Sequence, residues 1–184
     1  MWSGARAILA GLALLILAAS FGAYGYETTM QPVMTSVTVS EMVELIRSMS
    51  GDGVALLTQD ANDPDNASVE IRFSSGRRAW IQFYNKHRTV TYDALSSAMA
   101  SDRTSYSCIL LQAGFAVSSK PTAAAINDWN HTKIFGRASR DGELDPMFDA
   151  WFYFDGGVTV DAVKAFVKHC DTVITVFYTT FVTP

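Results

Sequence analysis

Three stretches of the chain repeat apolar residues with the 3.6-residue period of an α-helix. The first covers residues 39–49, and Thr38 and Glu41 at its start have the spacing of a capping box. The second covers residues 122–133. The third covers about residues 159–176 and begins with a threonine that we predict to be its N-cap. Its helical period outweighs its high content of valine and threonine, which favour strands.

Between the helical stretches, apolar and polar residues alternate with the period of a β-strand. Asp141-Gly142 is a strong signal for a hairpin turn between the last two strands. Residues 93–102 fit either a short helix or a long loop. The order of elements is therefore helix, strands, helix, hairpin and helix, with strands expected at residues 54–57, 69–73, 79–84, 105–112, 137–139 and 147–154.

The longest apolar run, residues 7–19, follows Arg6 near the N-terminus, and no further charge appears before Glu27. This pattern is typical of a secretory signal peptide. We expect a signal peptide at residues 1–25, an extended leader at 26–37 and a single domain at 38–184. The alternative is an uncleaved anchor in the inner membrane, since residues 7–26 are just long enough to span a bilayer. Either interpretation places the domain outside the cytoplasm, in the periplasm or secreted.

Composition narrows the possible functions further. The 184 residues carry a formal net charge of −4, and the sequence pI is near 5.2. Nucleic-acid binding is therefore not expected, because it normally requires a basic surface. The chain has two cysteines, Cys108 and Cys170. In an exported protein they could form a disulfide, but buried free thiols are equally ordinary.

Residues 125–160 read AINDWNHTKIFGRASRDGELDPMFDAWFYFDGGVTV. This stretch resembles the YbjN family of bacterial proteins, which are described as candidate sensory transduction regulators. The resemblance implies an α+β fold like that of type III secretion chaperones, a curved antiparallel sheet with helices packed on it. Such folds often dimerise and bind partner polypeptides, and the family offers no catalytic residues to carry over. The matching residues are Asn127, Trp129, Asn130, Phe135, Gly136, Arg137, Asp141, Gly142, Gly156, Gly157 and Val158.

No motif in the chain predicts a catalytic residue, a cofactor or a metal. His131 follows Asp128 on one helix face, but no G-x-S-x-G sequence supports a hydrolase. Neighbouring His169, Cys170 and Asp171 lack the spacing of real metal sites. The pair Arg77-Arg78 is expected to be a solvated turn. A calcium loop is conceivable but lacks the glycine and glutamate of an EF-hand, with candidate ligands Asp60, Asn62, Asp63, Asp65 and Asn66.

Aromatic residues are the most informative candidates. Trp80 and Tyr84, like Trp151 and Tyr153, should point away from the apolar side of their strands. Either the leader covers that face, or the rings form a patch for a dimer or a partner. Trp129 and Asn130 would anchor the end of the second helix, or else form a ligand-facing pair.

The leading hypothesis is an exported, non-enzymatic interaction or regulatory domain. It would bind itself, as a homodimer, or an envelope or secreted polypeptide. A small-molecule sensing module, with a pocket lined by Trp129, Trp151 and Tyr153, is the first alternative. A hydrolase is a second alternative with little support.

Overall fold

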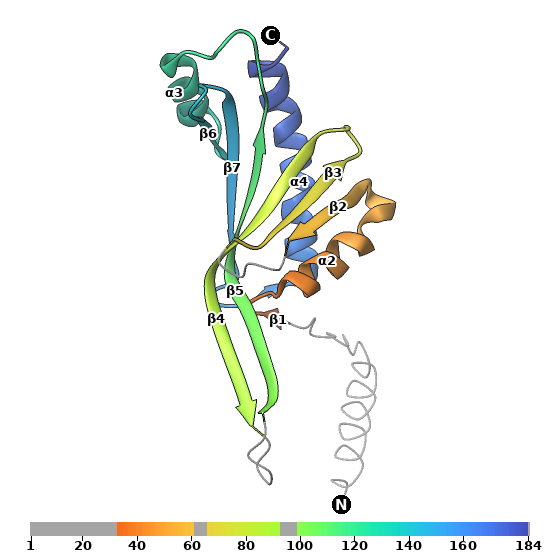
Figure 1. Ribbon diagram of the computed structural model, residues 1–184. Helices are drawn as coiled ribbons and strands as arrows, with labels where there is room; N and C mark the ends of the chain where they lie inside the picture. Colours follow the sequence, from red (N-terminus) through yellow and green to blue (C-terminus); the bar gives the residue numbers. More distant parts are fainter. Residues whose placement is uncertain (1–32, 61–65, 93–98, 184) are drawn as a thin grey trace, which may run out of the picture. The chain divides into compact units, whose positions relative to one another are not determined.

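The computed structural model describes residues 33–60, 66–92 and 99–183, which belong to one compact unit (Figure 1). An antiparallel sheet of six strands forms its framework, in the order β2-β3-β4-β5-β7-β6. The α+β fold implied by the resemblance is therefore confirmed. The strands are β2 (Val54–Asp60), β3 (Ser68–Phe73), β4 (Arg78–Tyr92), β5 (Met99–Gly114), β6 (Arg137–Arg140) and β7 (Pro146–Tyr153).

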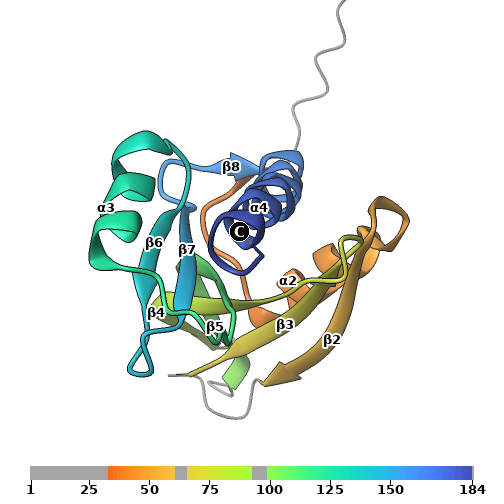
Figure 2. The same ribbon diagram turned by 90° about the horizontal axis from the view of Figure 1, so that it is seen from above.

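Three α-helices and a short 3₁₀ helix pack against this sheet. They are α2 (Val39–Ser48), η1 (Ser50–Asp52), α3 (Ala123–Thr132) and α4 (Val160–Phe181). The sheet curves around α4, which lies on its concave side (Figure 2). Helix α2 contacts β2 and β3, while α3 lies against the edge strand β6. All three helices contribute side chains to a single apolar core.

The expected helix starts are present at the atomic level. The Thr38 side chain accepts a hydrogen bond from the amide of Glu41, and the Glu41 carboxylate accepts one from the amide of Thr38. This is the complete capping box that the spacing predicts. Thr122 and Thr159 cap α3 and α4 through their hydroxyl oxygens alone, which accept hydrogen bonds from the amides of Ala125 and Ala162. Helix α4 continues past the predicted residue 176 to Phe181.

Strands β4 and β5 are much longer than the sequence pattern indicates. The expected strands 79–84 and 105–112 extend to 15 and 16 residues, and they pair as far as Tyr92 and Met99. Residues 99–102 are therefore strand, not the expected helix or loop, and residues 93–98 lie outside the described residues. Strands β3 and β7 pair only with the proximal half of this hairpin. The distal half consequently projects as a two-stranded ribbon (Figure 1).

The described end of the leader is built into the domain. β1 (Val33–Met34) pairs with β8 (Val158–Thr159), which follows the turn at Gly156-Gly157. Gly157 has a φ of +88°, and a Cβ atom there would lie 2.2 Å from a methyl carbon of Val33. Glycine is favoured at this position because other residues rarely adopt this positive φ, and the close approach of Val33 adds to the cost of a side chain. The predicted signal peptide lies outside the described residues. Among the helices that the structure does describe, none is long and apolar enough to cross a membrane.

Aromatic rings fill the centre of the core between α4 and the sheet. The fully buried Phe177 of α4 lies 5.8 Å from Phe148 of β7, between ring centroids. It also contacts Trp129 of α3 at 5.2 Å and Phe181 at 4.8 Å. One side chain thus joins the last helix to the sheet and to α3.

We expect Phe177→Ala to lower the free energy of unfolding by about 3–5 kcal/mol, because it leaves a cavity among these rings. Urea denaturation followed by circular dichroism would measure the change. The neighbouring Val176 is 42% exposed and provides the matched control. Val176→Ala should cost less than about 1 kcal/mol. Equal losses for the two variants would contradict the assigned packing of α4.

Candidate functional site

The convex face of the sheet carries a cluster of exposed aromatic rings. Strand alternation turns Tyr84, Trp151 and Tyr153 away from the core, as predicted, and these side chains are 39–55% exposed. The rings of Tyr84 and Trp151 lie 5.0 Å apart between centroids, and those of Trp151 and Tyr153 stack at 6.5 Å. They surround Cys108 and Leu110 of β5, which are 1% and 5% exposed. We call Tyr84, Trp151 and Tyr153 the aromatic cluster.

A row of hydrogen-bonded polar side chains crosses the same face. The Tyr84 hydroxyl donates to Gln82 Oε1 at 2.7 Å, and Gln82 Nε2 donates to Gln112 Oε1 at 3.4 Å. Gln112 Nε2 donates to a carboxylate oxygen of Asp149 at 2.7 Å, and the Ser139 hydroxyl contacts the other oxygen at 3.4 Å. These bonds restrict the side chains before any partner arrives. Binding at this face would therefore lose less conformational entropy.

Trp80 also points away from the core, as predicted, and is 37% exposed. It lies opposite Gln112 in the β4–β5 ladder, two residues before Gln82 along β4. Trp80 is therefore separated from the aromatic cluster by the polar row. It lines a different feature, a pocket that is described below.

Trp129 does not take part in any pocket with Trp151 and Tyr153. Its side chain is 2% exposed and packs against Phe177 and Phe181 on the concave side of the sheet. The expected sensing pocket of Trp129, Trp151 and Tyr153 is therefore not formed. The helix-face pattern correctly identified Trp129 as an anchor but could not show which element it contacts.

Asn130 closes the free edge of β6. Its side-chain amide donates to the carbonyl oxygen of Ala138 at 2.9 Å, and its side-chain oxygen accepts from the Ala138 amide at 2.8 Å. These are the two backbone groups that a further strand would otherwise pair with. Asn130 thus has a structural role at the sheet edge. This role uses both the NH₂ group and the oxygen of its side-chain amide.

The two cysteines are buried free thiols, and they cannot form the disulfide that the sequence left open. Cys108 lies on the convex side of β5, between Tyr84 and Tyr153 in the ladder. Cys170 lies in α4 within the core on the concave side. The sheet separates them, so the Cα–Cα distance of about 5–7 Å that a disulfide needs is out of reach. Burial raises the pKa of both thiols.

The other titratable and metal-binding side chains considered in the sequence do not gather at one site in the described residues. Asp145 accepts from the Lys120 ammonium at 2.5 Å and the Val117 amide at 2.8 Å, and these bonds lower its pKa. It therefore holds the loop before α3. In α4, the Cys170 side chain is buried in the core while the His169 ring packs against Phe135. The two side chains therefore point in different directions and do not form a common metal site. No group of metal-binding side chains occurs in the described ranges, and residues 61–65 of the conceived calcium loop lie outside them.

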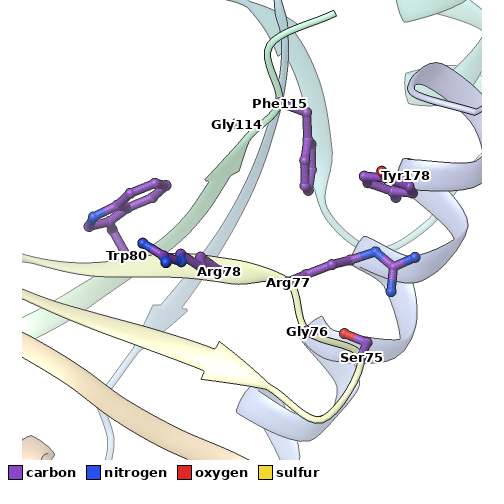
Figure 3. A pocket seen from close by; sticks show the side chains of 8 residues that line it. All are labelled: Ser75, Gly76, Arg77, Arg78, Trp80, Gly114, Phe115 and Tyr178. Atoms are coloured by element: carbon purple, nitrogen blue, oxygen red, sulfur yellow. The ribbon is translucent and has the colours of Figure 1, made fainter.

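Sequence reasoning missed a pocket of about 460 Å³ beside the β3–β4 turn (Figure 3). It is lined by Arg77 of the turn, by Arg78 and Trp80 at the start of β4, by Phe115 after β5 and by Tyr178 of α4. Arg77 is half-buried, and its guanidinium carbon lies 4.4 Å from the centre of the Tyr178 ring. The arginine pair is therefore not simply a solvated turn. The lining residues are about 100 positions apart in sequence, so no local signal could have found them.

Comparison with known proteins identifies the family. The model of the YbjN family, described as "Putative bacterial sensory transduction regulator", matches residues 76–182. The chain belongs to the YbjN family. No curated protein and no solved structure gives a significant match. The family match begins at the β3–β4 turn and runs through α4, so it includes the aromatic cluster and most of the pocket. The YbjN family is described as a regulator and not as an enzyme.

Asn130→Ala should lower the free energy of unfolding by about 1–3 kcal/mol, because it removes two hydrogen bonds to the β6 edge. The neighbouring Asn127 of α3 is exposed and makes a matched control. Asn127→Ala should change stability by less than about 0.5 kcal/mol. Urea denaturation would measure both variants. If Asn127→Ala were as destabilising as Asn130→Ala, the edge contact would not be the cause.

Neither thiol of the native chain should react with Ellman's reagent at pH 8, because burial raises the pKa and blocks access. Tyr153→Ala should uncover Cys108 and release one equivalent of the coloured product per chain. Trp80→Ala, which opens the same face away from Cys108, should release none. Rapid reaction of the unmodified native chain would show that the cluster does not shield Cys108.

Proposed function

We propose that this YbjN-family chain is an exported, non-enzymatic regulatory domain that binds a polypeptide through the convex face of its sheet. The description of the family as a regulator supports the regulatory role. The apolar run at residues 7–19 after Arg6 supports export to the periplasm or beyond. Anchoring by residues 7–26 would keep the same domain at the membrane surface.

The observation that carries this proposal is the exposure of the aromatic cluster. Tyrosine and tryptophan are enriched where proteins bind each other, because they bury large apolar areas with few rotatable bonds. Tyr84, Trp151 and Tyr153 gather on one face and remain 39–55% exposed in the described part of the chain. The leader, from residue 33 onward, packs beside β8 and does not cover them. The cluster is thus a preformed anchor for a partner.

A second copy of the domain is the occupant that this face fits most directly. Two sheets pack face to face by interdigitating their side chains, and a two-fold axis would place one aromatic cluster against the other. The face also offers both donors and acceptors in the Gln82, Gln112 and Asp149 row, which suits a self-complementary contact. At the β6 edge, Asn130 already occupies both backbone groups of Ala138, which disfavours strand addition there.

The test is the oligomeric state of the chain recovered from the cell envelope. Sedimentation velocity over a range of concentrations should show a monomer–dimer equilibrium for the native protein. The double variant Trp151→Ala/Tyr153→Ala should weaken the association constant at least about tenfold, because each ring is a candidate hot spot worth about 1–2 kcal/mol. N-terminal sequencing of the same sample reports whether the signal peptide is removed.

Val176→Ser provides the control, since Val176 is a similarly exposed apolar residue on α4. It should leave the association constant unchanged. A native chain that stays monomeric at all concentrations would overturn self-association. Crosslinking to an envelope protein that depends on Trp151 and Tyr153 would then assign the face to that partner. If neither contact depended on these residues, the proposal would be wrong.

A further inference from the structure

The pocket of Figure 3 has an unusual electrostatic character for an acidic chain. None of the residues that line it, all within the described part of the protein, is acidic, while Arg77 and Arg78 contribute two positive charges. The chain as a whole has a formal net charge of −4. A concave site with charge of one sign concentrates ligands of the opposite sign. This site therefore favours an anion.

The two guanidinium groups are only weakly neutralised by the protein. Arg78 lies 3.4 Å from Glu70, but its side chain is 62% exposed, so this ion pair is weak. Arg77 donates to the Thr175 hydroxyl at 3.3 Å, and no described carboxylate forms an ion pair with it. Its buried Nε has no hydrogen-bond partner among the described residues. Arg78 can therefore donate hydrogen bonds to an incoming carboxylate, while the Arg77 guanidinium, stacked on Tyr178, adds positive potential to the pocket.

Aromatic rings stand on two sides of the pocket, and the Arg77 and Arg78 side chains extend away from each other towards these two sides. Figure 3 shows Trp80 and Arg78 on one side of the pocket and Phe115 and Tyr178 on the other. The Phe115 ring is held by Tyr178 at 5.2 Å and by Phe177 at 6.1 Å, so its position is fixed by the core. A flat apolar ring could stack against such walls. The volume of about 460 Å³ is within the range of small-molecule sites.

We propose that this pocket binds a small planar aromatic carboxylate. The ring of the ligand lies between Trp80 and Phe115, and its carboxylate receives hydrogen bonds from Arg78, with Arg77 as the second positive charge. The site shares Trp80 and Arg78 with the convex face but contains no residue of the aromatic cluster, so the inference does not depend on polypeptide binding. A ligand here would touch the β3–β4 turn, the end of β5 and α4 at once.

Titration calorimetry of the full chain, as recovered from cells, with phenylacetate tests this proposal. Phenylacetate should bind, and the uncharged phenylacetamide should bind at least about tenfold more weakly, because it lacks the charge that the arginines recognise. Cyclohexylacetate keeps the charge but lacks the flat ring, and its affinity should fall several-fold.

Two pairs of matched variants localise the site. Arg78→Gln should weaken phenylacetate binding at least about fivefold. Arg47→Gln, at an exposed arginine of α2 that does not line the pocket, should leave it unchanged. Trp80→Ala should weaken binding, whereas Trp151→Ala, which the proposed function expects to affect self-association, should not. Circular dichroism would establish that each variant is folded.

The proposal would be overturned by any of three results. These are the absence of phenylacetate binding at millimolar concentration, equal affinities for phenylacetate and phenylacetamide, and equal losses for Arg47→Gln and Arg78→Gln.

Discussion

The packing of α4 against the concave side of the sheet determines what the rest of the domain presents to solvent. Once Phe148, Ala150 and the neighbouring core residues turn towards this helix, the two-residue period of a strand sends Trp151 and Tyr153 to the other face. The position of the aromatic cluster thus follows from the positions of the core residues, because the two sets alternate along the same strands. Any substitution that loosened α4 would also weaken the order of the convex face, although the rings of the aromatic cluster belong to β4 and β7.

The helices and the inward-facing strand residues could be predicted from the sequence. Both depend on interactions and apolar periods between residues that are close together in the chain. The capping box at Thr38 and Glu41 involves only one turn of helix, and the period of α4 reports the buried stripe directly. The distal parts of β4 and β5 were missed because they are polar on both faces. Arg88 and Asp102 pair across that ribbon through two hydrogen bonds, a contact with no apolar alternation to reveal it.

The candidate site was also predictable in part, because the alternation of residues along a strand is a local signal. Strand parity alone showed that Trp80, Tyr84, Trp151 and Tyr153 turn outward, but it could not show that Trp80 stands apart from the others. Trp129 was grouped with the exposed rings because a helical face does not reveal which neighbour it meets. The arginine pocket depends on contacts between β4 and α4 that only the folded chain brings together.

The two thiols on opposite sides of the sheet have a consequence for how the chain matures. Neither Cys108 nor Cys170 has a partner of its own kind within reach, and both are enclosed once the core and the aromatic cluster form. Folding then requires neither a thiol oxidase nor a disulfide isomerase. The same structure is available in a reducing or an oxidising compartment, because no disulfide contributes to its stability.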